Sequence, residues 1–174
     1  MLTFVALDFE TATNARDSAC ELAMVRVEDG RIAAEASSLI RPPTPEFRFT
    51  WLHGIDWSTV ETAPTFADVL PKVHALCAGA DFLAAHYAPF DKGVMAAAAA
   101  RYGLAPPPQP YVCTMRLSRA VWNIRPTKLD DVCNALGISL ERHHRAGCDA
   151  RACAEIVIKG LNEIGEDAFR TRYL

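Results

Sequence analysis

The sequence lacks an apolar run long enough to span a membrane, and its N-terminus has no basic segment followed by an apolar core. The first absence predicts a protein without membrane spans, and the second argues against a secretory signal peptide. Internal repeats and linker-like segments are missing too. We therefore expect the 174 residues to form one cytoplasmic domain spanning residues 1–174, which is long enough to bury a sizeable core.

Cys-x-x-Cys pairs are also absent, and a chain of this length needs no disulfide framework. The six cysteines are therefore expected to be reduced and mostly buried thiols. Cys148 and Cys153 lie near His143 and His144 in the sequence, which permits a zinc site. The spacing is poor for zinc ligands and no second pair exists, so packing in the core is the favoured interpretation.

The net charge of −3 and the 51% hydrophobic content are ordinary for a soluble globular protein. The charge is unevenly distributed, however. Residues 101–151 contain eight basic and four acidic side chains, a net charge of +4, which leaves −7 for the rest of the chain. Such a basic stretch fits either a surface that faces phosphates or a mixed, solvated face.

Two carboxylates follow the first apolar segment of the chain. Residues 2–9 are almost continuously apolar and predict a central strand, with Asp8 and Glu10 where it ends. Side chains two positions apart on a strand point to the same face, so these two carboxylates should repel each other. A divalent cation such as Mg²⁺ or Mn²⁺ would relieve that repulsion, because hard oxygen ligands suit these ions. The alternative is a polar strand end without chemistry.

The remaining apolar patterns alternate between strand and helix periodicity and predict an α/β sheet with helices packed against it. Asp29-Gly30 between two apolar runs predicts a hairpin, Pro71 is expected to kink its helix, and residues 42–57 read as an irregular loop. The predicted strands are 2–9, 20–28, 31–40, 81–86 and 111–114, and the predicted helices are 66–77, 89–102, 115–122, 129–136 and 148–163.

Two further acids, Asp91 and Asp149, fall in the first turns of predicted helices. Helix capping alone would explain either of them. Together with the first pair, they make four carboxylates at strand ends and helix starts, where open α/β sheets assemble ligand sites. A histidine, His144, precedes Asp149 by five positions. Four carboxylates and one imidazole make two-metal phosphodiester hydrolysis plausible.

At this point the motifs resemble a known family, the DnaQ-like 3′–5′ exonucleases of the DEDDh type. The segment 8–11 (Asp-Phe-Glu-Thr) is similar to their first motif, 86–91 to the second, and His144 with Asp149 to the third. The segments 51–55 (Trp-Leu-His-Gly-Ile) and 63–66 (Ala-Pro-Thr-Phe) are similar to the region that links these motifs. The resemblance covers nearly the whole chain, as a single exonuclease domain.

The resemblance implies a ribonuclease-H-like fold, with a mixed five-stranded sheet flanked by helices and an antiparallel second strand. It implies that four carboxylates hold two Mg²⁺ or Mn²⁺ ions and that His144, not His143, is the general base. It also implies that the backbone around Thr11 and Ala12, together with His53, holds the terminal nucleotide. The implied metal ligands are Asp8, Glu10, Asp91 and Asp149.

The chain departs from the family pattern at Tyr87, where members usually have asparagine. A phenol there could stack on a base or narrow the site, so Tyr87 is expected to affect substrate preference. The chain also stops at Leu174 without an extension that could tether it to a polymerase, which favours a stand-alone nuclease over a replicase subunit.

We therefore expect a metal-dependent 3′–5′ exonuclease that releases nucleoside 5′-monophosphates from the 3′ ends of single-stranded nucleic acid, with DNA favoured. The alternatives are an exoribonuclease that trims RNA 3′ ends and a non-catalytic nucleic-acid-binding module of the same fold. The proline run at 106–110 suggests a third alternative, a protein recruited by partners. Oligomeric state is beyond the sequence.

Overall fold

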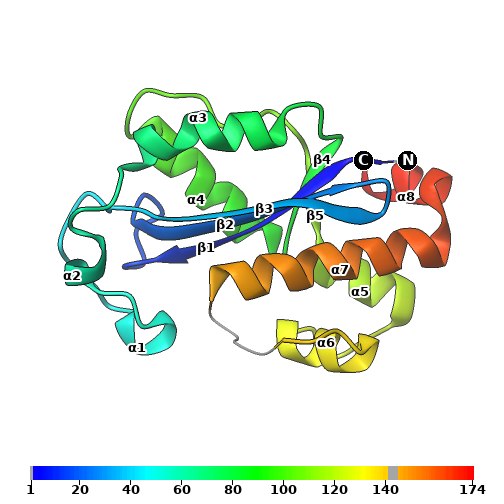
Figure 1. The fold of residues 1–174 in the computed structure, drawn as a ribbon. Helices are drawn as coiled ribbons and strands as arrows, with labels where there is room; N and C mark the ends of the chain where they lie inside the picture. The colour runs from blue at the N-terminus through cyan, green and yellow to red at the C-terminus, as the bar shows by residue number, and fades with distance from the viewer. Residues whose placement is uncertain (1, 141–144) are drawn as a thin grey trace.

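One mixed sheet of five strands organises the chain in the computed structural model, which describes residues 2–140 and 145–174 (Figure 1). The strand order is β3-β2-β1-β4-β5. β2 is antiparallel to both β1 and β3, whereas β4 is parallel to both β1 and β5. The strands are β1 (Phe4–Thr11), β2 (Ala19–Glu28), β3 (Arg31–Leu39), β4 (Phe82–Ala85) and β5 (Tyr111–Cys113).

The turn between β2 and β3 is the predicted hairpin. Asp29 and Gly30 both adopt positive φ, 51° and 70°. A two-residue turn with positive φ at both positions matches the twist of the flanking strands and favours this residue pair. The hairpin places β2 beside β1 over the full length of β1, from Phe4 to Thr11.

Helices cover both faces of the sheet (Figure 1). α3 and α4 lie on one face, and the long α7 lies on the other with α5 and α6 beyond it. The helices are α1 (Thr50–His53), α2 (Trp57–Val60), α3 (Phe66–Cys77), α4 (Ala88–Ala100), α5 (Thr114–Trp122), α6 (Leu129–Leu136), α7 (Ala146–Ile164) and α8 (Glu166–Tyr173).

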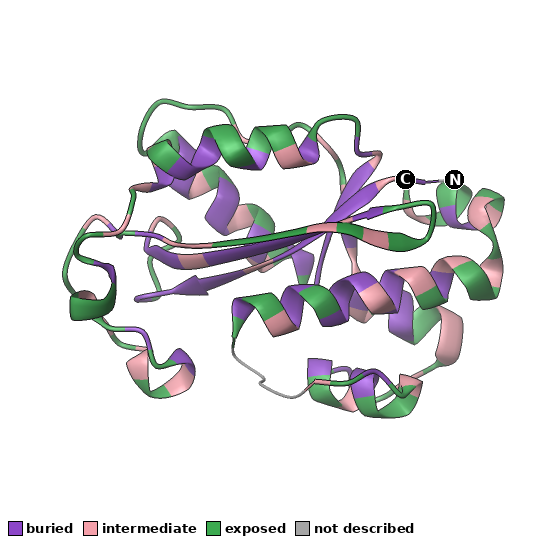
Figure 2. Ribbon diagram, viewed as in Figure 1, coloured by how far each residue is buried: buried purple, intermediate pink, exposed green. Residues whose placement is uncertain are grey.

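The alternation of side chains along β1 divides the core into two clusters. Phe4 and Ala6 pack in the cluster that contains the buried residues of α7, and Phe4 stacks on Phe82 of β4 with ring centroids 5.0 Å apart. Val5 and Leu7 pack in the cluster under α3 and α4. Both clusters are fully buried around the sheet (Figure 2). Even-numbered positions of β1 therefore point toward α7.

The C-terminal end of β1 extends beyond the end of its parallel neighbour, β4. Pairing between β1 and β4 ends at Ala6 and Ala84, while β1 continues to Thr11 beside β2. This end of β1 therefore has a ladder partner on one side only. The first turns of α4 and α7 lie near this opening, so their side chains reach it.

The predicted strands and helices are present with shifts of at most two residues at their ends, and α3 and α6 have the predicted bounds. The carboxylates Asp8 and Glu10 lie within β1, not at its end, because pairing with β2 extends the strand to Thr11. One short helix, α1, interrupts the segment 42–57 that was predicted to be irregular, and a second, α2, begins at its last residue. The kink expected at Pro71, which lies inside α3, stays a prediction.

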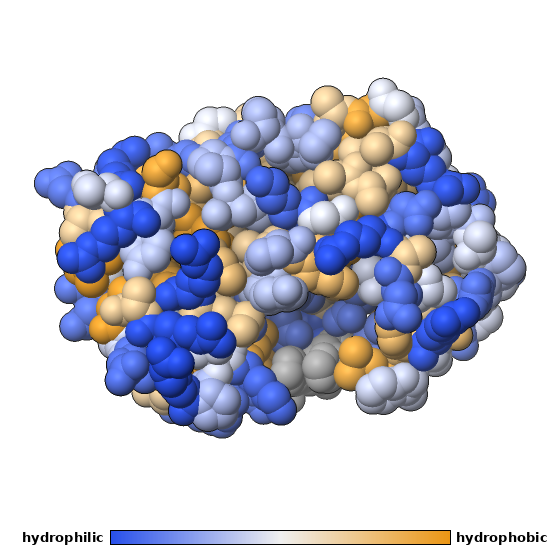
Figure 3. Space-filling view, turned by 180° about the vertical axis from the view of Figure 1, so that it is seen from behind, coloured by the Kyte–Doolittle hydropathy of each residue, from blue (hydrophilic) through white to orange (hydrophobic). Residues whose placement is uncertain are grey.

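The last helix, α8, was not predicted. It begins after Gly165, whose φ of 76° ends α7, and it is held by a single fully buried side chain, Phe169. Within residues 2–140 and 145–174, the structure has no helix with the length and apolarity that a membrane span needs. The face opposite to that of Figure 1 carries mostly hydrophilic side chains between separate apolar patches, and it is hollowed near its lower edge (Figure 3).

Candidate active site

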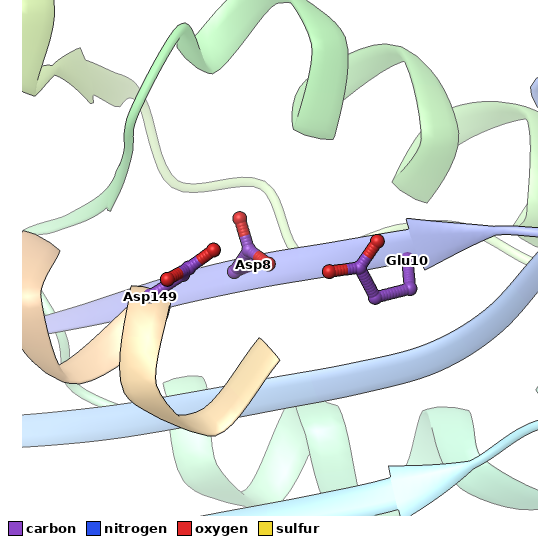
Figure 4. Close-up of side chains that lie close together, drawn as sticks. All are labelled: Asp8, Glu10 and Asp149. Carbon is purple, nitrogen blue, oxygen red and sulfur yellow. The ribbon is translucent and has the colours of Figure 1, made fainter. Parts of the chain in front are cut away.

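Three carboxylates converge at the open end of β1. Asp8 and Glu10 project from β1 toward α7, and Asp149 projects from the first turn of α7 toward them (Figure 4). One oxygen from each of the three lies within 4.8 Å of the others. Among the described residues, this is the one group of three or more potential metal ligands. The period of two along β1 and the packing of α7 on the same face bring the three acids together.

Asp91 approaches the same place from the opposite face of the sheet. It lies in the first turn of α4, is 1% exposed, and accepts a hydrogen bond of 3.1 Å from the backbone N–H of Phe9. It is not a member of the three-carboxylate group. Its charge nevertheless reaches that group, because it is the main electrostatic cause that raises the pKa of Asp8 after burial.

The pKa values of these acids are raised above their usual range. Burial, followed by repulsion from the neighbouring carboxylates, raises the pKa of Asp8 well above its usual range. The same two causes raise the pKa of Glu10 to about 8. Burial raises the pKa of Asp91 to about 7, although the Phe9 N–H and the charge of Arg16 oppose the rise. A site that disfavours its own charges in this way fits a bound cation.

A fifth acid, Glu21, adds to this repulsion. It lies directly opposite Glu10 in the β1–β2 ladder, and its charge raises the pKa of Glu10. Burial raises the pKa of Glu21 itself, and a hydrogen bond from the backbone of Ala146 and the charge of Arg145 lower it. Glu21 therefore connects β2 to the start of α7, the helix that carries Asp149.

A cleft of about 830 Å³ opens over the carboxylates. Its lining includes most of the β1–β2 loop, the segment around α1, and the start of α6. The residues that line it are Asp8, Phe9, Glu10, Thr11, Thr13, Asn14, Ala15, Arg16, Phe49, Leu52, His53, His86, Phe90, Lys128, Leu129, Asp130 and Asp149. This volume suits a nucleotide-sized ligand.

His53 lines the cleft and connects α1 to the end of β1. Its side chain is buried, its Nε2 lies 3.2 Å from the carbonyl oxygen of Thr11, and its Nδ1 accepts a 3.0 Å hydrogen bond from the N–H of Ile55. This pair of partners requires a neutral ring with the proton on Nε2, because a carbonyl can only accept. His53 thus positions the backbone of Thr11, which also lines the cleft.

Two other predicted substrate-binding residues lie outside the cleft lining. Ala12 is fully buried, with its N–H donated to Ser18 and its carbonyl accepting from Arg48. Tyr87 is 56% exposed and adopts a left-handed backbone conformation (φ 68°) just before α4. Neither lines the cleft. A contact of either residue with substrate stays a prediction.

His144, the predicted general base, and His143 lie outside the described residues. The zinc alternative placed Cys148 and Cys153 with them. Within the described part of the chain, neither cysteine belongs to a group of potential metal ligands. All six cysteines are free thiols, and four of them, including Cys153, are buried.

Several residues of the cleft were missed by the sequence reasoning, although some are neighbours of its motifs. Phe90 precedes Asp91, and Leu52 precedes His53, so both could have been found by proximity. His86 was placed in a motif without a role; its Nδ1 lies 2.8 Å from the Thr114 hydroxyl and its Nε2 lies 2.9 Å from the Thr127 carbonyl oxygen. His86 therefore ties the end of β4 to the segment before α6.

Comparison with known families identifies the class of protein. The exonuclease family model RNase_T matches residues 5–157, which include all but the first residue of β1, the cleft and most of α7. The chain belongs to this exonuclease family. The family expected from the motifs is thereby confirmed, as is the ribonuclease-H-like, mixed five-stranded sheet with its antiparallel second strand.

Individual relatives agree with the family assignment. The chain is 35% identical to a PolC-type DNA polymerase III of Caldanaerobacter subterraneus subsp. tengcongensis over 94% of its own length and 12% of the relative. It is 32% identical to a putative bifunctional exonuclease/endonuclease protein of Mycobacterium tuberculosis over 97% of its length and 28% of the relative. The chain thus spans a small part of these curated relatives.

Among solved structures, the chain is similar to exonuclease X in complex with 5′-overhanging duplex DNA. The TM-score is 0.77 and the sequence identity is 28%, with 95% of this chain and 94% of exonuclease X covered. In contrast to the curated relatives above, exonuclease X is matched by the chain over almost the full length of exonuclease X.

Proposed function

We propose that the protein is a metal-dependent 3′–5′ exonuclease that removes nucleoside 5′-monophosphates from the 3′ ends of single-stranded DNA. The observation that carries the proposal is the convergence of Asp8, Glu10 and Asp149 within 4.8 Å in a nucleotide-sized cleft. A surface that only binds nucleic acid gains nothing from acids that face phosphates, which disfavours the non-catalytic module.

The donor set fits Mg²⁺ or Mn²⁺. The three converging groups are all carboxylates, which are hard ligands, and burial and mutual repulsion raise the pKa values of Asp8 and Glu10. Asp91, close enough to repel Asp8, would complete a four-carboxylate set for two ions. When bound, such ions supply an activated water and stabilise both the attacking and the leaving oxygen.

The side chains have separable roles in this proposal. Asp8, Glu10, Asp91 and Asp149 hold the ions. His144 takes the proton of the attacking water at a ring nitrogen, for which an imidazole is suited near neutral pH. Thr11, whose backbone His53 supports, contacts the terminal nucleotide. Tyr87 and the backbone of Ala12 are the further substrate contacts that we propose.

DNA is the favoured substrate because exonuclease X, which is similar to this chain over nearly its full length, is described in complex with DNA. The RNA alternative is tested by comparing rates on DNA and RNA oligomers of matched sequence, since a protein distinguishes the two by the 2′-hydroxyl. Faster cleavage of RNA would replace the proposed substrate. That the nuclease works apart from a polymerase stays a proposal, because the PolC-type relatives carry the similar segment as 12% of their length.

The proposal is tested with a 5′-labelled single-stranded DNA oligomer and Mg²⁺ or Mn²⁺. We expect stepwise shortening from the 3′ end, loss of activity in EDTA, and a collapse of turnover in Asp8→Asn, because metal ligands fail as a unit. Asp167→Asn, which removes an exposed carboxylate of α8, is the matched control and should stay active. Activity that survives EDTA, or binding without turnover in Mn²⁺, would overturn the proposal.

The role of His144 needs its own measurement. His144→Ala should lower the rate of cleavage while calorimetric binding of Mn²⁺ remains close to wild type. If Mn²⁺ binding were lost along with the rate, His144 would be a metal ligand and not the general base.

A further inference from the structure

Gly93 is out of place in its helix. α4 has the sequence APFDKGVMAAAAA, and it ends in five alanines, the residue that favours helix most. A glycine in the interior of a helix is destabilising relative to alanine. Gly93 has no positive φ that would require it. The reason must therefore lie in what packs against it.

The neighbour that fills the space of a side chain at position 93 is Arg16, from the β1–β2 loop. A Cβ atom built on Gly93 would lie 2.6 Å from Nη1 of Arg16 and 2.9 Å from its Cδ, inside van der Waals contact. Any larger residue at position 93 would displace the arginine side chain. The glycine thus provides the space in which the Arg16 side chain lies.

Arg16 is held in this space by the first turn of α4. Its Nη1 donates a 2.9 Å hydrogen bond to the carbonyl oxygen of Phe90 and a longer one, of 3.4 Å, to that of Pro89. Its guanidinium carbon lies 5.4 Å from the centre of the Phe90 ring, a cation–π distance. Three different contacts therefore fix the position of one exposed, long side chain.

The loop that carries Arg16 is itself anchored at several points. Asp17 forms a 2.9 Å salt bridge with Arg101, just beyond α4, and the hydroxyl of Ser18 donates to the carbonyl of Ala15 at 2.6 Å. The N–H of Thr13 donates to the same hydroxyl at 3.1 Å. The backbone around Arg16 is consequently fixed before any ligand arrives, which reduces the entropy that binding would cost.

The contacts within the protein leave part of the guanidinium available. Only Nη1 donates a hydrogen bond within the described residues, so Nε and Nη2 keep three N–H donors for a ligand. Arg16 also lines the cleft. The described lining has four carboxylates, Asp8, Glu10, Asp130 and Asp149, against two full positive charges, Arg16 and Lys128. A phosphodiester strand entering this cleft needs those cations.

We infer that Arg16 is a preset phosphate-binding residue, which contacts the backbone of the substrate strand beside the carboxylate cluster, and that Gly93 is glycine to make room for it. The inference rests on the proposed function for its ligand, a single-stranded nucleic acid. A guanidinium is well suited to this role, because its fork of donors matches phosphate oxygens. Arg16 would contact phosphate and not bases, so its contribution should not depend on sequence.

The first experiment measures binding of a single-stranded DNA oligomer in EDTA, where no cleavage occurs, at several salt concentrations. Each phosphate contact to a single strand contributes about −0.7 to the slope of log K against log salt. Arg16→Met, which keeps most of the apolar stem, should weaken binding and make the slope shallower by about that amount. Arg31→Met, which removes an exposed charge on β3, is the matched control and should leave the slope unchanged.

The second experiment moves the arginine without removing it. Gly93→Ala should weaken binding in the wild-type background, because the new Cβ displaces the guanidinium. In an Arg16→Met background the same substitution should have no further effect on binding, because its effect acts through Arg16. Equal effects of Gly93→Ala in both backgrounds would overturn the link between the two residues.

The results separate this inference from the proposed function. A wild-type protein that neither binds nor cleaves single-stranded DNA would overturn the function. If the wild type binds and cleaves single-stranded DNA but Arg16→Met has the same salt slope as the wild type, the inference alone is overturned. A lower melting temperature of Arg16→Met with an unchanged slope would show that Arg16 only attaches the loop to α4. A shallower salt slope of Arg16→Met together with an unchanged melting temperature supports the inference.

Discussion

The backbone N–H of Phe9 donates its hydrogen bond to the carboxylate of Asp91, a residue 82 positions away on a helix that packs on the opposite face of the sheet from α7. This N–H is available because β1 continues past the end of β4. One carboxylate thereby accepts a backbone N–H at the open strand end and also raises the pKa of Asp8.

Substitutions of Asp91 should separate its structural role from its chemical one. Asp91→Ala leaves a buried N–H without a partner, which costs about 1–3 kcal/mol in the free energy of unfolding. Asp91→Asn keeps an oxygen for Phe9 and removes a repelling charge, so its metal-free stability should equal or exceed that of the wild type. Both should lose nuclease activity. Denaturant unfolding in EDTA measures the difference, and an Asp91→Asn protein as unstable as Asp91→Ala would contradict it.

The metal-free protein should lose stability as pH rises from about 5 to about 8. Glu10 has a folded pKa of about 8 and Asp91 one of about 7, both above the values of the unfolded chain. The folded state therefore holds more protons in this range, and its free energy of unfolding falls as pH increases through the folded pKa values. Thermal unfolding in EDTA at a series of pH values measures this dependence.

A variant provides the control for the pH prediction. Glu10→Gln cannot ionise, and it also removes one source of repulsion on Asp8, so its melting temperature should vary less with pH. Saturating Mn²⁺ should restore stability to the wild type most strongly at the higher pH, since ligands of the folded state stabilise it. A wild-type melting temperature that rises from pH 5 to pH 8 in EDTA would contradict the assigned pKa directions.

His53 should matter for stability as well as for the cleft. His53→Ala removes its contact with the Thr11 carbonyl and its hydrogen bond with the Ile55 N–H, both buried. We expect a loss of about 1–3 kcal/mol in stability and a higher KM for oligonucleotide, because the backbone of Thr11 is no longer supported. Trp51→Ala on the same helix, where the side chain is 78% exposed, should leave stability nearly unchanged. A His53→Ala protein with wild-type stability would contradict this view.

Helix α8, which the sequence did not predict, should contribute to the stability of the core. Phe169 of α8 is fully buried, with its ring centroid 5.5 Å from that of Phe82 and 5.0 Å from that of Tyr173. Phe169→Ala should cost about 3–5 kcal/mol in the free energy of unfolding, because it leaves a cavity under the sheet. Tyr173→Ala, at a partly buried position, should cost less. Similar losses for both would mean that α8 is held by its surface and not by Phe169.

The sequence predicts well what depends on local periodicity. The alternation along β1 puts Asp8 and Glu10 on one face, and Asp29-Gly30 encodes the hairpin in two residues. α8 was missed because one buried phenylalanine in eight mostly polar residues gives no helical pattern. Its burial depends on Phe82, 87 positions earlier in the chain, and no local pattern carries that contact.

The residues of the site likewise include some that local sequence predicts and some that it does not. The motifs and the family resemblance pointed to four acids, and the structure brings three of them, Asp8, Glu10 and Asp149, into one group. No local pattern shows that the helices which carry Asp91 and Asp149 lie on opposite faces of the sheet. Arg16 lies in a loop of small and polar residues, where nothing local distinguishes it from a solvated arginine. Its role becomes visible only through Gly93, which is 77 positions away.

The packing of α7 against β1 has a consequence for when the site can assemble during translation. The strand that supplies Asp8 and Glu10 precedes, in the order of synthesis, the helix that supplies Asp149, with every other strand of the sheet between them. In a chain that folds during synthesis, these three carboxylates can therefore converge only after α7 has emerged and docked. Assembly of the site would therefore depend on translation having passed α7.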